Sequence, residues 1–182
     1  LFRELKHWKT LAVHVWPMVV ISFTVWTIDS FVWTTGAVWT EKLIHESFWG
    51  ALIIPAYQLP SLFMGFVVAK WGIYEGKKRL AIKFLFFSGI FMAALGLTDV
   101  IPLQILLIFA SSLMLSVTHP MTEGVYSDLV SRLLNKKDHL IGLSSSTINV
   151  AYIIGPILAG FLASSVGEKM TFSYLGMVTV LL

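Results

Sequence analysis

The hydrophobic positions of the chain gather into long runs that contain few or no ionisable side chains. Residues 47–69 and 140–167 contain no Asp, Glu, Lys, Arg or His, and the run 100–122 is interrupted by His119 alone. Residues 10–40 contain only two ionisable side chains. Because a helix needs about 20 mostly apolar residues to cross a hydrocarbon core of about 30 Å, each run predicts a transmembrane helix.

The whole pattern predicts an all-α fold, a polytopic membrane helix bundle. We expect a cytoplasmic amphipathic lead over residues 1–10, followed by spans over residues 11–40, 47–69, 80–98, 101–131, 140–166 and 170–182. The last of these is too short to cross a bilayer. Since the chain also begins with Leu1 rather than Met, we expect a fragment of a longer protein whose last helix is truncated.

Composition supports a membrane protein and argues against an enzyme. The 182 residues are 57% hydrophobic and only 13% charged, whereas about 25% of the residues in soluble domains are charged. The absence of cysteine excludes disulfides, a thiol nucleophile and a thiolate metal site. No HExxH motif is present, so the sequence predicts no metal and no cofactor.

The basic residues indicate how the chain is oriented. If the spans alternate in direction, only Lys42 and Lys169 lie on one side of the membrane. Eleven cations lie on the other side: Arg3, Lys6, Lys9, Lys70, Lys77, Lys78, Arg79, Lys83, Arg132, Lys136 and Lys137. The positive-inside rule makes this second side cytoplasmic, together with the N-terminus of the chain. These cations could also bind RNA or anionic lipid, but topology explains the net charge of +3 without a nucleic-acid partner.

The first span carries an acid between two tryptophans. Trp26, Asp29 and Trp33 share one face of a regular helix, which also carries Ser22, Gly36 and Thr40. A carboxylate beside indole rings can bind an organic cation, and an acid in the membrane can also carry a proton. The alternative is a structural role, with Asp29 hydrogen-bonded to a neighbouring span and the tryptophans packing or lying at the interface.

His119 and Glu123 lie four residues apart in the fourth span and therefore on one helix face. An imidazole and a carboxylate in this arrangement can relay protons. The alternative is a polar pair in the cytoplasmic third of the membrane, where water reaches it. Farther along the same helix, Asp128 and Arg132 are expected to form an interfacial ion pair.

The fifth span combines small residues with polar ones. Ala151, Gly155 and Ala159 recur at intervals of four, which predicts a face that another helix approaches closely. The adjacent face carries the other unusual residues of this span: Asn149, Tyr152, Pro156 and Gly160. Pro156 removes one backbone hydrogen bond and can bend the helix. We expect this helix at an interface between moving parts, with ordinary bundle packing as the alternative.

Two motifs resemble the major facilitator superfamily. Its G-x-L-x-D-R-x-G-R-R motif, which lies between the second and third spans of each half, is matched in part by Gly65, Lys70 and Gly72, and Ala69 stands where the family prefers Asp. After three extra residues, the basic end of the motif is matched by the segment "GKKR", which contains Lys77, Lys78 and Arg79.

The segment "AYIIGPILAG" at 151–160 resembles the G-x-x-x-G-P-x-x-G-G motif that antiporters of the family carry in their fifth span. This motif is most typical of the N-terminal half. In contrast, the missing Asp, the basic lead and the lack of Arg or Lys between Val100 and Ser131 resemble the C-terminal six-helix half.

The resemblance implies a secondary active transporter, most like the drug:proton antiporters, that moves a small organic solute across the cytoplasmic membrane by alternating access. It implies protons and the other half of the same chain as partners. The implied substrate residues are Trp26, Asp29, Trp33, Asn149 and Tyr152, and the implied coupling residues are Asp29, His119 and Glu123. The implied gating residues are those of the motif between the second and third spans, Gly65, Gly72, Lys77, Lys78 and Arg79. The alternative is a non-transporting receptor or assembly protein on the same scaffold, because the motif that contains Ala69 is broken.

Overall fold

The structure is a computed structural model that describes residues 2–45, 48–71, 76–132 and 137–182. These residues form helices and short turns, and no strand occurs among them. The helices are α1 (Phe2–Phe31), α2 (Ala37–Ile44), α3 (Ile53–Trp71), α4 (Lys77–Ala94), α5 (Ile101–Arg132), α6 (Lys137–Val166) and α7 (Glu168–Leu181). Gly72, which the sequence places in a gating motif, lies outside the described residues.

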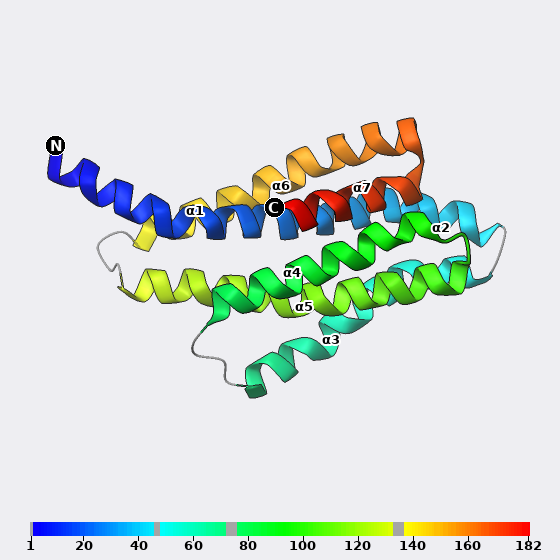
Figure 1. Ribbon diagram of the computed structural model, residues 1–182, viewed down its shortest axis with the longest axis horizontal. Helices are drawn as coiled ribbons and strands as arrows, with labels where there is room; N and C mark the ends of the chain where they lie inside the picture. The colour runs from blue at the N-terminus through cyan, green and yellow to red at the C-terminus, as the bar shows by residue number, and fades with distance from the viewer. Residues whose placement is uncertain (1, 46–47, 72–75, 133–136) are drawn as a thin grey trace.

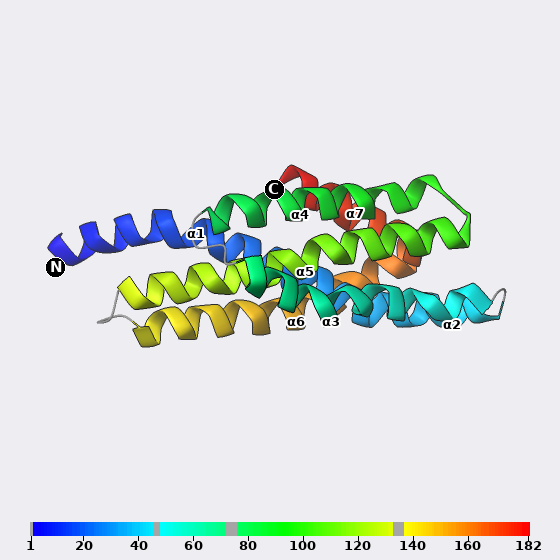
Figure 2. The ribbon, with the colours of Figure 1, turned by 90° about the horizontal axis from the view of Figure 1, so that it is seen from below.

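Five segments are long and apolar enough to cross a membrane: Val15–Ile44, Phe48–Lys70, Lys77–Leu97, Ile101–Leu129 and Leu140–Val166. They lie lengthwise in one bundle, and the N-terminal part of α1 extends beyond the other helices (Figures 1 and 2). The all-α polytopic bundle predicted from the sequence is therefore confirmed, and the chain is a multi-pass membrane protein. α7 is shorter, with 14 residues.

The first span departs from a regular helix. Between α1 and α2, the five residues Val32–Gly36 form a π-helical segment, which we call the π-turn. The sequence pattern predicts one uninterrupted helix here, because hydrophobic periodicity carries no signal for a single extra residue within a turn. The π-turn begins three residues after Asp29.

The helices pack as neighbouring pairs around a continuous apolar core. α4 contacts α5 and α7, α3 contacts α5, and α1 contacts α6. Fully buried side chains from different helices fill the core, among them Met18, Ile28, Leu95 and Leu115. Many large hydrophobic side chains, such as Phe66 with 80% exposure, lie on the outside. Hydrocarbon is the solvent for such side chains in a multi-pass protein.

Small residues allow α7 to dock closely on α4. A Cβ atom built on Gly176 would lie 2.3 Å from the backbone nitrogen of Ala93 and 2.6 Å from the carbonyl oxygen of Gly89. Beside this crossing, the Ser173 hydroxyl donates to the Ala93 carbonyl over 2.7 Å. Since backbone atoms cannot move aside, only glycine fits at position 176. This is the close approach that small residues permit between membrane helices.

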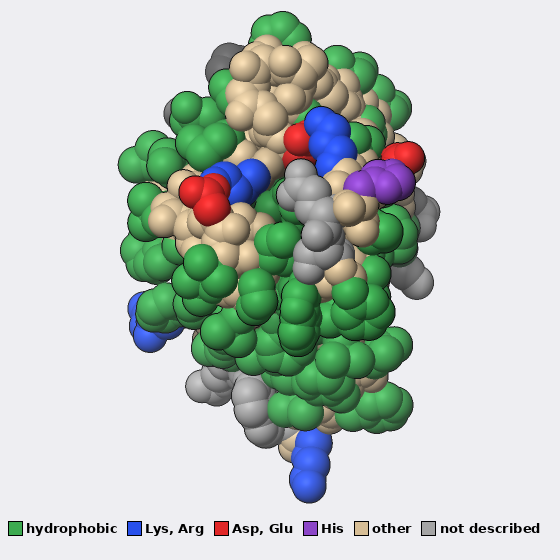
Figure 3. All heavy atoms as spheres, turned by 90° about the vertical axis from the view of Figure 1, so that its right-hand side faces the viewer, with side chains coloured by type: hydrophobic (Ala, Val, Ile, Leu, Met, Phe, Trp, Pro, Cys, Tyr) green, Lys and Arg blue, Asp and Glu red, His purple; other side chains and the backbone are tan. Residues whose placement is uncertain are grey.

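Ion pairs join helices at both ends of the bundle. Lys42 of α2 pairs with Glu168, and the adjacent Lys169 pairs with Asp99 in the turn between α4 and α5. Figure 3 views this end and shows acidic and basic side chains gathered on it. Desolvation opposes the charged form of Glu168, but the hydrogen bond from Lys42, a backbone hydrogen bond and the Lys42 charge together lower its pKa.

At the opposite end of the bundle, Lys77 at the start of α4 donates to Asp128 of α5 over 2.7 Å. The sequence predicts a pair between Asp128 and Arg132, but the side chain of Arg132 lies outside the part of the chain that the structure describes. The pair that the structure contains therefore joins two helices, whereas the predicted pair lies within one.

Candidate functional site

The Asp29 carboxylate lies where α1, α3 and α6 meet. The Tyr57 hydroxyl of α3 donates to one carboxylate oxygen over 3.0 Å, and the Tyr152 hydroxyl of α6 donates to the other. Asp29 itself is partly buried. Two donors thus take the place of water around a carboxylate inside a membrane span, where an unsolvated charge is costly. The structure therefore places an acid with a defined orientation about halfway along the first membrane-spanning segment, Val15–Ile44.

Tyr57 is held in place by its own helix contacts. Its side chain is only 6% exposed, and the hydroxyl of Ser112 on α5 donates to its backbone carbonyl. Sequence reasoning missed Tyr57. The available signal was a hydroxyl-bearing side chain within the charge-free run 47–69. That signal is weak, because the run does not reveal which neighbouring helix the hydroxyl faces.

Aromatic rings form one wall beside the carboxylate. The Trp26 ring meets His119 of α5 edge-on, with ring centroids 4.8 Å apart and an interplanar angle of 74°. The same indole lies 5.9 Å from the Tyr152 ring. Trp26 therefore connects the residue that bonds Asp29 with the histidine of α5. Edge-on contacts of this kind fix the relative orientation of the rings.

The structure brings together four of the predicted site residues, namely Trp26, Asp29, His119 and Tyr152. With Tyr57 they form what we call the Asp29 cluster. Three others lie near the cluster in sequence but point outward. Trp33 is 52% exposed, Asn149 is exposed on α6, and Glu123 is exposed on α5. Within the described parts of the chain, no hydrogen bond or ion pair joins Glu123 to His119.

The two faces of α6 have different surroundings. Ala151 and Ala159 are fully buried, and a Cβ built on Gly155 would lie 1.7 Å from the Ser30 hydroxyl oxygen of α1. This small-residue face packs against α1 of the same bundle. Tyr152 and Gly160 on the adjacent face are exposed, and Pro156 is partly buried between the two faces.

The remaining predicted gating residues lie at the ends of α3 and α4. Gly65 is exposed, with nothing within 4 Å of an added Cβ. Lys77 forms the ion pair with Asp128, while Lys78 and Arg79 are exposed in the first turn of α4. These residues share one end of the bundle and lie apart from the Asp29 cluster.

The chemistry available at the cluster is that of one carboxylate, two phenols, an indole and an imidazole. Such a set can bind a cation through charge and a ring face, and its acid can take up or release a proton. No group of three or more His, Cys, Asp or Glu able to hold a metal ion occurs among the residues that the structure describes.

Comparisons with known proteins agree with this architecture. The sequence model of the Major Facilitator Superfamily matches residues 15–182. The comparisons with curated proteins and with solved structures returned no match. The matched region covers all five membrane-spanning segments and α7. The chain therefore belongs to the Major Facilitator Superfamily, whose members are membrane transporters rather than enzymes.

Proposed function

We propose that the chain is part of a proton-coupled antiporter that exports a small organic cation by alternating access. The observation that carries this proposal is the Asp29 carboxylate, bridged by the Tyr57 and Tyr152 hydroxyls beside the Trp26 ring. A charged residue within a membrane span is costly, and such residues mark substrate and ion pathways in transporters. Among the described residues, the Asp29 cluster combines a carboxylate, aromatic ring faces and a side that is exposed at Tyr152.

The cluster suits a cationic substrate. The carboxylate supplies the opposite charge, and the indole face of Trp26 supplies cation-π attraction. Tyr152 is 39% exposed and Asn149 is exposed beside it, so a solute can reach Asp29 from the side of α6. Trp33, at 52% exposure, lies within the π-turn four residues after Asp29 and is open to a solute. Trp26, Asp29, Trp33, Asn149 and Tyr152 are the proposed substrate residues.

Coupling to protons follows from competition for one carboxylate. A cation that binds from the inner side displaces the proton from Asp29, and a proton that arrives from the outer side displaces the cation. His119 contacts Trp26, and Glu123 lies four residues nearer the inner end of α5. His119 and Glu123 thus follow each other along α5 from the level of Trp26 toward the inner end of the helix. We assign His119 and Glu123 to the release of the proton.

The exposed face of α6 suits contact with a second six-helix half. Alternating access requires two such halves that rock around a shared site near the membrane midplane. In this arrangement the chain is the C-terminal half, and the Asn149, Tyr152 and Gly160 face borders the substrate cavity. The exposed Lys78 and Arg79 lie at the cytoplasmic end. The N-terminus of the chain shares that side of the cell membrane.

Proton movement driven by a substrate tests this function. Inside-out membrane vesicles that contain the full-length protein are loaded with a pH-sensitive dye, their lumen is acidified, and ethidium is added outside as a monovalent organic cation. We expect ethidium to accumulate while the lumen pH rises, because each cation that enters releases protons outward. Accumulation without proton movement would contradict coupling. The absence of both would contradict transport and favour a receptor or assembly role.

A further inference from the structure

The π-turn lies next to the Asp29 cluster and interrupts the helix that carries it. In a π-helix the backbone hydrogen bonds join residues five apart instead of four, so the turn contains one residue more than an α-helical turn. Single π-turns inside α-helices occur frequently at functional sites. Here the turn covers Val32–Gly36, and Asp29 is one helical turn before it.

The extra residue changes which neighbours the two parts of the span face. One residue corresponds to about 100° of rotation around a helix axis. Before the π-turn, α1 packs mainly on α6, whereas after it α2 packs mainly on the turn Phe48–Leu52 and also contacts α3 and α7. Trp39 of α2 lies 5.6 Å from the Phe172 ring of α7. If the same sequence formed a regular helix, all residues after this point would be turned by about 100° around the helix axis relative to those before it. The first part of the span could then face α6, or the second part could face α7, but not both.

Thr34 is placed to hold the π-turn. Its hydroxyl donates to the carbonyl of Ser30 over 2.8 Å. In a regular α-helix that carbonyl accepts the amide of residue 34 itself. A threonine hydroxyl that bonds back to a carbonyl four residues earlier often bends helices, and Thr34 makes this bond from within the π-turn.

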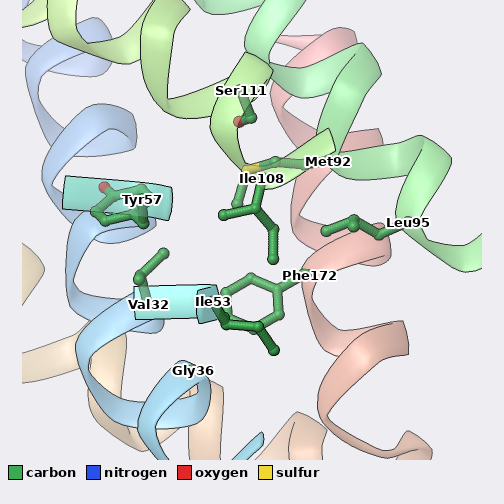
Figure 4. A pocket seen from close by; sticks show the side chains of 9 residues that line it. All are labelled: Val32, Gly36, Ile53, Tyr57, Met92, Leu95, Ile108, Ser111 and Phe172. Carbon is green, nitrogen blue, oxygen red and sulfur yellow. The ribbon is translucent and has the colours of Figure 1, made fainter. Parts of the chain in front are cut away.

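A small gap in the packing lies directly beside the π-turn. A cavity of about 10 Å³ is lined by Val32 and Gly36, the first and last residues of the turn, and by Tyr57 of the Asp29 cluster. Figure 4 shows these residues around the cavity, with Phe172 and Ile108 on the opposite wall. The volume is close to the smallest that holds one water molecule, so the turn borders a gap in the packing.

We propose that Thr34 is a positioning residue for the transport site. By holding the π-turn, it sets the rotation of the Asp29 part of α1 relative to α2, and thereby aligns Asp29 with Tyr57 and Tyr152. This inference rests on the proposed function, because alignment of the carboxylate matters for transport only if Asp29 binds the substrate and the proton.

The test compares two threonines of the same span. Thr24 forms the same bond as Thr34, from its hydroxyl to the carbonyl of Val20 over 2.8 Å, but within regular α1. The full-length protein is prepared as Thr34→Val, Thr34→Ser and Thr24→Val. Ethidium transport into inside-out vesicles is measured for KM and for its pH profile.

Thr34→Val is expected to raise KM about three- to tenfold, since one hydrogen bond that aligns the site is lost. It is also expected to change the pH profile of transport, which a purely structural role of the residue would leave unchanged. Thr34→Ser keeps the hydroxyl and should match the unaltered protein, as should Thr24→Val.

The inference is overturned if Thr34→Val keeps both KM and the pH profile, even if it lowers the amount of protein in the membrane, because the residue is then structural only. Equal shifts in Thr24→Val and Thr34→Val would also overturn it. Asp29→Asn in the same assay distinguishes a failure of the Thr34 inference from a failure of the proposed function. If Asp29→Asn leaves transport and its pH profile unchanged, the proposed function itself fails.

Discussion

Asp29→Asn is expected to abolish proton-driven export of ethidium while the protein still inserts into the membrane. The substitution keeps the size of the side chain, and its amide oxygen can still accept a hydrogen bond from one of the two tyrosines, but it removes the charge that binds a cation and the acid that carries a proton. Hydrogen bonds and contacts to a charged group contribute about 1.5 to 3 kcal/mol, so ethidium binding should weaken about ten- to a hundredfold.

The measurement is ethidium accumulation in inside-out vesicles with and without an imposed pH gradient. Glu41→Gln is the matched control, because Glu41 is an exposed acid of α2 near the C-terminal end of the same span. It loses the same charge outside the cluster and should transport normally. Gradient-driven transport by Asp29→Asn at the level of Glu41→Gln would remove Asp29 from the mechanism.

Gly155→Leu is expected to abolish transport with a much smaller loss of membrane insertion. A Cβ at this position would lie 1.7 Å from the Ser30 hydroxyl oxygen and 3.0 Å from the Ser30 Cβ atom. The larger side chain therefore pushes α6 away from α1 at the point where Tyr152, one turn earlier, reaches Asp29. Insertion depends on the apolar length of the span, which the substitution keeps.

Gly160→Leu provides the comparison, because nothing lies within 4 Å of a Cβ added at that exposed glycine of the same helix. Transport and the amount of membrane protein are measured for both variants. Gly155→Ala combined with Ser30→Gly should recover transport relative to Gly155→Ala alone, since Ser30→Gly removes both atoms that the new Cβ meets. If Gly155→Leu transports as well as Gly160→Leu does, the contact with α1 is not required.

The fold follows closely from the sequence because a bilayer imposes one dominant constraint. Every backbone polar group must be bonded within the segment, so charge-free runs of sufficient length form helices. The packing of those helices is harder to predict from the sequence. Gly176 is required by a backbone contact with α4, but nothing in the pattern of residues 170–182 distinguishes it from a glycine that faces lipid.

The Asp29 cluster was only partly predictable for a related reason. A helical wheel places residues at about 100° intervals, and up to Asp29 this placement is sound: Trp26 and Asp29 both meet Tyr152. The π-turn then changes the register, so the wheel does not describe where Trp33, Gly36 and Thr40 point. Tyr57 was missed because its role depends on a neighbouring helix, and single-chain periodicity does not contain that information.

Protection of a single cysteine tests the central claim, that the substrate binds at the Asp29 cluster. The chain contains no cysteine, so Asn149→Cys introduces one reporter on the exposed face of α6 beside Tyr152. Its reaction with a maleimide is followed in membranes at increasing ethidium concentrations, in a background without other cysteines. The account predicts that ethidium protects this cysteine with a half-maximal concentration near the KM for transport, and that Asp29→Asn removes the protection. Labelling that ethidium does not slow, or protection that persists in Asp29→Asn, would contradict it.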